Sequence, residues 1–158
     1  MVELPYGDDM NFVMDVIIPP DGLSADEFVS GLDSESLSRL SAGLQTDEIR
    51  LMLPSFKAEY DVSLNAALQR LGMKEAFTSS ADFSDMSKEQ LMISEVRQKT
   101  FIEVNEEGSE AAAITSVSMM RASLGPEPVR FTVDRPFVFL IRERTSGTVL
   151  FMGLVRNL

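Results

Sequence analysis

The sequence predicts an α+β fold. Segments with the two-residue alternation of β-strands are interspersed with short segments that have the three- and four-residue leucine spacing of helices, and regular βαβ alternation is absent. At 158 residues and 44% hydrophobic composition, the chain is large enough for one hydrophobic core but not for two. We therefore expect a single domain.

The first half of the chain predicts two strands followed by two short helices. Val2 already begins a strand pattern, and a second β-rich run closes in a Pro-Pro-Asp-Gly turn. Ser24 followed by Glu27 has the spacing of a capping box, and leucines then recur at helical intervals. The predicted elements are strands at 2–6 and 10–18 and helices at 24–32 and 34–44.

The second half predicts mainly strands. An alternating run contains Pro54, which we interpret as a bend or a bulge, and three leucines then mark a helix that ends at Gly72. Thr145-Ser146-Gly147 is typical of a hairpin turn between two apolar strands. The predicted elements are strands at 48–56, 57–62, 91–104 and 131–133, a helix at 64–72, and a hairpin of 137–144 with 148–156.

Charge is distributed unevenly along the chain. Residues 1–96 hold 18 acidic and 6 basic side chains, whereas the remainder holds 7 and 8, and together they give the net charge of −11. A negative field repels phosphate backbones, so nucleic acid is not an expected partner, and a solvated acidic surface is the simplest interpretation. No apolar run approaches the roughly 20 residues that a membrane span needs, and the first residues do not resemble a signal peptide.

The composition predicts no catalytic residues, no cofactor and no metal ligands. The chain has neither cysteine nor histidine, which removes the thiolate and imidazole nucleophiles and the strongest zinc ligands. Three carboxylate clusters, Asp8-Asp9, Asp82 with Asp85, and Glu106-Glu107, lie in hydrophilic stretches without EF-hand spacing, so we interpret them as surface turns. Neither a Gly-x-Ser-x-Gly elbow nor a glycine-rich phosphate loop is present.

The run from Glu106 to Leu124 is the most informative segment. It is small and sparsely apolar, lies between two predicted strands, and ends at Gly125-Pro126-Glu127-Pro128. A long loop of this kind in a compact chain is usually functional or disordered.

This run also alternates with period two. One set of alternate residues is small or apolar and carries no charge: Ser109, Ala111, Ala113, Thr115, Val117 and Met119. The intervening set begins at Glu110 and continues through Ala112 and Ile114 to Met120. Such a segment fits a sheet with one face toward a core, and Gly108 provides a backbone hinge. From composition, a plain loop, a short helix capped by Ser109 and a conditional strand all remain open.

Several motifs resemble the serpins, the family of serine protease inhibitors. Glu106-Glu107-Gly108-Ser109-Glu110-Ala111-Ala112-Ala113 looks like the proximal hinge of the serpin reactive centre loop. The run at 131–141 is similar to the C-terminal signature of the family, and the run at 151–157 is similar to the closing strand. The segments 51–56 and 71–77 also have the expected form and order.

The resemblance implies that residues 1–158 are the C-terminal part of a single serpin domain, with mixed and antiparallel sheets, short helices and a mobile reactive centre loop at about 107–128. It implies two strands of the large sheet at 48–62 and 91–106, the buried-sheet hairpin at 137–156, and a third-sheet strand at 129–134. We expect the N-terminal portion to be a second chain, or this chain to be a recombinant or proteolytic piece; a reduced homologue is the alternative.

The implied activity is inhibition of a serine protease by conformational trapping, not catalysis. The hinge would comprise Glu106 and residues 108–113, and Thr115, Val117 and Met119 would continue the inserting face. Counting from Gly108 puts the attacked bond at Ala122-Ser123, which suits an elastase-like protease, whereas Arg121 would suit a trypsin-like one and Met120 is a further option.

The resemblance leaves other properties of the whole protein open. A secreted, periplasmic or cell-surface location is expected, and the absence of cysteine fits a prokaryotic member. Gln98 stands where many members have histidine, and Ile114 is bulkier than usual but on the outward face. A non-inhibitory serpin acting as chaperone, carrier or structural protein, and a free-standing interaction module, are the alternative functions.

Overall fold

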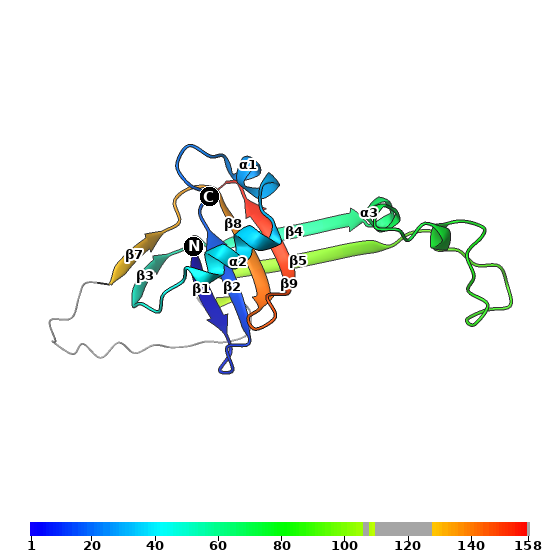
Figure 1. The fold of residues 1–158 in the computed structure, drawn as a ribbon, viewed down its shortest axis with the longest axis horizontal. Helices are drawn as coiled ribbons and strands as arrows, with labels where there is room; N and C mark the ends of the chain where they lie inside the picture. Colours follow the sequence, from blue (N-terminus) through cyan, green and yellow to red (C-terminus); the bar gives the residue numbers. More distant parts are fainter. Residues whose placement is uncertain (106–107, 110–127, 158) are drawn as a thin grey trace. The chain divides into compact units, whose positions relative to one another are not determined.

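The computed structural model describes residues 1–105, 108–109 and 128–157 (Figure 1). The chain divides into two compact units, Met1–Phe56 with Val104–Leu158 and Lys57–Glu103. In chain order the elements are β1 (Val2–Tyr6), β2 (Phe12–Ile17), α1 (Ala25–Ser30), α2 (Ser34–Ala42), β3 (Ile49–Met52), β4 (Phe56–Ser63), α3 (Asn65–Arg70), a 3-10 turn (Glu75–Phe77), β5 (Arg97–Asn105), β6 (Gly108–Ser109), β7 (Val129–Thr132), β8 (Phe137–Glu143) and β9 (Val149–Val155). Strands with few, short helices confirm the predicted α+β class.

The first unit is built on a four-stranded antiparallel sheet in the order β1-β2-β8-β9. Its two central strands are largely apolar, and each face of them is covered. On one face Ile17, Val138 and Leu140 form a core cluster with side chains of α1 and α2. On the other face the ring of Phe56 contacts Phe137 and Phe139, with ring centroids 5.5 and 5.4 Å apart.

Both helices of this unit begin at a residue whose side chain caps the helix. Ser24 and Glu27 form the reciprocal hydrogen bonds of a capping box at α1, and Asp33 and Ser36 do the same at α2. Because the first helical N–H groups lack intrahelical partners, these caps fix where each helix starts. Helix α1 is shorter than predicted, since it ends at Ser30.

The prediction that residues 48–62 form one strand of one sheet is wrong. The chain leaves strand geometry at Leu53, Pro54 and Ser55, because proline has no N–H to give to a ladder. Before this break β3 pairs in parallel with β7 in a two-stranded sheet, and after it β4 joins a different sheet beside β5.

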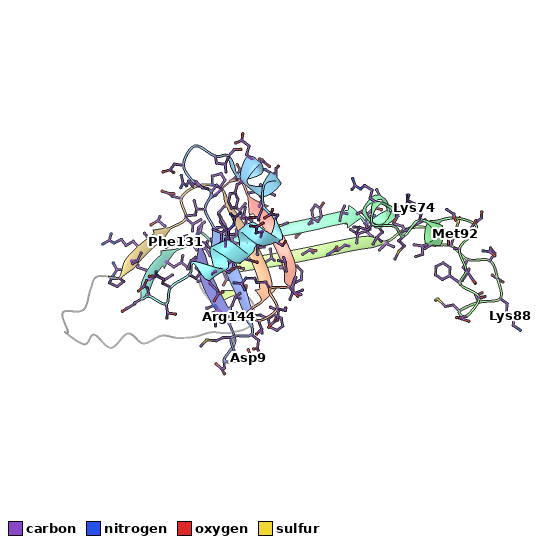
Figure 2. All side chains as sticks on the ribbon, viewed as in Figure 1. Asp9, Lys74, Lys88, Met92, Phe131 and Arg144 are labelled. Carbon is purple, nitrogen blue, oxygen red and sulfur yellow. The ribbon has the colours of Figure 1, made fainter. Side chains whose placement is uncertain are left out.

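The second unit contains most of β4 and β5, with α3 and an irregular segment between them. Lys74, Lys88 and Met92 lie on this irregular segment (Figure 2). The strand predicted from 91 starts only at Arg97. The backbone N–H of Ile93 donates to the Ala76 carbonyl, and that of Val96 to the Asn65 side chain, so both donors are used outside a ladder.

Candidate functional site

The proximal end of the candidate loop is joined to β5 by a short antiparallel ladder. Gly108 and Ser109 form β6, in which Ser109 lies opposite Val104 and Gly108 opposite Asn105. These two are the described members of the predicted hinge. Glu106, residues 110–113, Thr115, Val117, Met119 and the predicted reactive bond at 120–123 lie outside the described residues.

One face of the β4–β5 pair is charged. Lys57 Nζ lies 2.9 Å from Glu103 Oε1, and Arg97 binds both carboxylate oxygens of Asp61 at 2.6 and 3.1 Å. The hydrogen bond to Asp61 raises the pKa of Arg97. Because most of these side chains are well exposed, each pair contributes little to stability, and their main consequence is to define a hydrated face.

The alternate residues of β5 form its less exposed face. Val104 is buried, and Ile102 and Thr100 are half-buried, whereas Lys99 and Phe101 between them are exposed. Val104 is the residue that lies opposite Ser109. Beside β6, β5 therefore carries these less exposed side chains on one face and the charged side chains on the other.

The distal end of the candidate loop is held by a parallel pairing. Val129 of β7 lies opposite Ile49 of β3, and this register continues to the pair of Thr132 with Met52. The N–H of Val133 donates to the Met52 carbonyl at 2.8 Å and extends the pairing by one residue. Phe131 lies in the middle of β7 (Figure 2). Both flanks of residues 110–127 are thus anchored to strands.

The structure adds a charge cluster that the sequence reasoning missed. Asp15 of β2 and Arg142 of β8 are buried in the four-stranded sheet and hydrogen-bonded to one another, with Arg142 Nε 2.6 Å from Asp15 Oδ2. Burial raises the pKa of Asp15, and the bond to Arg142 opposes that rise. The available signal was one charged residue within each of two otherwise apolar runs, FVMDVI and FVFLIR.

Among the described residues there is neither a metal-binding cluster nor a membrane-spanning helix. No group of three or more Asp or Glu side chains there has the arrangement to hold a metal ion. Nor does any described helix have the length and apolar character needed to cross a bilayer.

Comparison with known proteins decides the family. The family model described as "Serpin (serine protease inhibitor)" matches residues 1–158. The chain belongs to the serpin family. It is 40% identical over 158 residues to Iripin-2 of Ixodes ricinus, covering 100% of this chain and 40% of that protein. It is also 40% identical over 162 residues to the leukocyte elastase inhibitor of Homo sapiens, covering 97% and 42% respectively.

The fold comparison agrees with the sequence comparison. The native state of the thermophilic serpin tengpin superposes with a TM-score of 0.78 at 34% identity, covering 98% of this chain and 41% of that one. The predicted serpin fold is confirmed. The chain spans about 40% of the length of these relatives.

Proposed function

We propose that the protein containing this chain inhibits a serine protease as a suicide substrate, with residues 107–128 as its reactive centre loop. The observation that carries the proposal is the antiparallel pairing of β6 with β5 at the predicted hinge. A loop strand inserted beside β5 would take both its starting point and its direction from this pairing. The name of the human relative, leukocyte elastase inhibitor, supports the activity class.

If the loop continued the β5–β6 register, each of its residues would lie opposite a specific residue of β5. Ala111 would lie opposite Ile102 and Ala113 opposite Thr100, because each step moves one residue along both strands. The uncharged set of alternate residues would then share the face of Val104, and Glu110 would share the charged face with Glu103. This division suits insertion, since no charge would be buried on the less exposed face.

The proposed reaction begins with attack on the loop. The protease serine would attack the carbonyl carbon of Ala122, and the bond to Ser123 would break with Ser123 leaving as a new amino terminus. Insertion of the cut loop beside β5 would carry the bound protease away before the ester is hydrolysed. Arg121 or Met120 as the attacked residue would direct the inhibitor to a protease with a different pocket.

We further propose that the remaining serpin portion, as a second chain or as an upstream part of the same protein, covers β9. Four consecutive apolar residues of β9, from Val149 to Met152, are 40 to 58% exposed. Apolar surface of this extent on consecutive residues requires a cover. The relatives are about two and a half times as long as this chain, so they contain enough further residues to supply this cover.

A covalent-complex assay tests the inhibitory function. The chain, alone and together with the complementary part of a serpin domain, is incubated with elastase and separately with trypsin. We expect an SDS-resistant complex with elastase only when the complementary part is present, and fragment masses that locate the cut at Ala122. Cleavage without any covalent complex would support a non-inhibitory serpin, and failure to associate with the complement would indicate an inactive fragment. Fractionation of the cells that produce the whole protein, with detection of the protein in each fraction and in the medium, would test the predicted secreted, periplasmic or cell-surface location.

A further inference from the structure

Four charged side chains form a cluster across three strands of the β1-β2-β8-β9 sheet. Arg142 Nη2 lies 2.5 Å from Glu3 Oε2 and 3.3 Å from Asp15 Oδ1, in addition to the short bond from its Nε to Asp15. Arg144 Nη2 lies 3.0 Å from the other Glu3 oxygen. Arg142 therefore joins β8 to both β2 and β1, and the side chains of Asp15 and Arg142 are 1% and 9% exposed.

Hydrophobicity alone specifies the alignment of these strands weakly. Five of the six residues of β2 and the first five of β8 are apolar, and nearly all of them are buried. In a half-buried sheet a one-residue slip exposes the apolar face, but here both faces are apolar, so that penalty is largely missing. An interaction other than apolar burial must therefore make the native alignment of β2 and β8 more stable than the misaligned ones.

The charges disfavour three of the four slips of one or two residues between β2 and β8. Asp15 lies opposite Leu140 and Val13 opposite Arg142, so Asp15 and Arg142 are diagonal neighbours on one face. A one-residue slip would move Asp15 to the opposite face from Arg142. A two-residue slip that brings Asp15 opposite Val138 would separate them along the strand. A two-residue slip in the other direction would place Asp15 directly opposite Arg142 and would keep the ion pair. That slip is opposed instead by the end of β8 at Glu143, since Val13 would lie past it.

We propose that the Glu3–Asp15–Arg142–Arg144 cluster is a register lock for β1, β2 and β8. Buried ion pairs contribute little net stability compared with apolar side chains of similar volume, but breaking one leaves an unpaired buried charge. The cluster therefore acts mainly by making misaligned sheets unfavourable. It is independent of the proposed inhibitory function, since none of its members belongs to the loop or its flanks.

The absence of cysteine in the chain permits a direct measurement of register. Cysteine at position 141 is combined in turn with cysteine at 14, 13 or 12. Met14 is opposite Ile141 in the native alignment, whereas Val13 and Phe12 would be opposite it after slips of one and two residues. Directly opposed residues in antiparallel strands lie within disulfide range, so oxidation during refolding reports each alignment.

In the parent background we expect only M14C/I141C to oxidise efficiently. In the D15L/R142L background, Glu3 keeps Arg144 as its partner. We expect the yields of the V13C/I141C and F12C/I141C disulfides to rise at least several-fold in this background. The urea midpoint should stay at or above the parent value. The control D61L/R97L removes an exposed ion pair of the β4–β5 sheet and should leave all three disulfide yields unchanged.

Two outcomes would overturn the register lock. One is unchanged yields of the slip reporters in D15L/R142L. The other is loss of folding in both D15L/R142L and the milder D15N/R142Q variant, which would mean that the cluster supplies stability instead of alignment.

Discussion

At the scale of single residues, Gly153 shows how closely β8 and β9 pack. It lies opposite Phe139, and a Cβ at position 153 would come within 2.4 Å of two ring carbons of Phe139. The ring cannot move freely, because it also contacts Phe56. The glycine is therefore needed for side-chain space rather than for a left-handed backbone conformation.

We expect Gly153→Ala to destabilise the protein by about 1–3 kcal/mol, because the added methyl group overpacks the Phe139 ring. Urea unfolding followed by circular dichroism measures this change. Gly31→Ala is the matched control, since its Cβ would meet only ordinary contacts at 3.7 Å. Equal unfolding midpoints for the two variants would contradict the packing argument.

Glu143 makes a second residue-scale prediction, which concerns pH. Hydrogen bonds from Ser146 and Thr145 in the β8–β9 turn lower the pKa of Glu143 to about 2. Because the folded pKa is below the ordinary value of 4.5, the carboxylate stabilises the turn fully above that value and progressively less as pH falls toward 2.

The stability difference between the parent and Glu143→Gln should therefore be largest near neutral pH and shrink between pH 4.5 and about 2. Carbon-13 NMR titration of Glu143 measures the pKa directly, and unfolding curves at several pH values measure its consequence. A titration midpoint near 4.5 would show that the turn hydrogen bonds do not favour the carboxylate.

At the scale of elements, the agreement between prediction and structure depends on whether the signal was local. The capping pair of Ser24 with Glu27 and the leucine spacing over 34–44 are both local signals, so the starts of α1 and α2 could be predicted closely. The β8–β9 hairpin was also predictable, because Thr145-Ser146-Gly147 separates two apolar runs. The partner of β3 was not, since parallel pairing with β7 joins residues far apart in sequence.

The candidate site also combines local sequence patterns with a long-range strand pairing. The hinge and the alternating loop are predictions from a pattern of consecutive residues, and most of their residues lie outside the described part of the chain. The register of Gly108 and Ser109 on β5 required coordinates, because it joins two strands whose pairing no local pattern specifies.

This register predicts opposite outcomes for two adjacent substitutions. Ala113→Glu would place a carboxylate on the less exposed face beside Thr100, so we expect slow insertion and conversion of inhibitor into substrate. Ala112→Glu, its matched control, would place the same charge on the hydrated face beside Phe101 and change inhibition much less.

The two variants are compared in the complete serpin by the number of inhibitor molecules that are consumed for each protease molecule trapped. It should rise several-fold for A113E and remain near the parent value for A112E. The reverse order of the two variants would mean that the loop enters the sheet in a different register.

At the scale of the whole molecule, exposed apolar surface accompanies a high net charge. The chain carries a formal charge of −11, which opposes self-association at neutral pH. The apolar residues of β9 favour association with a covering partner. We therefore expect β9 to associate with a covering partner rather than with a second copy of this chain.

The 158-residue chain alone should bind a hydrophobic dye such as ANS, and its fluorescence should fall several-fold when the complementary serpin portion is added. Titration at neutral pH, with light scattering to detect aggregates, measures both steps. Met152→Lys should weaken the complementation, whereas the control Lys88→Ala on the second unit should not. Dye fluorescence unchanged by the complement would contradict the assignment of β9 as the covered strand.

The sequence by itself determined the α+β class, the helix starts, the hairpin and the serpin motifs, because each rests on residues close together in the chain. Only the tertiary structure decided that β3 and β4 join different sheets, that Gly153 makes room for Phe139, and that Glu3, Asp15 and Arg142 meet. These contacts join segments up to 139 positions apart. Their free energy depends on distances between strands, and no local pattern of residues encodes those distances.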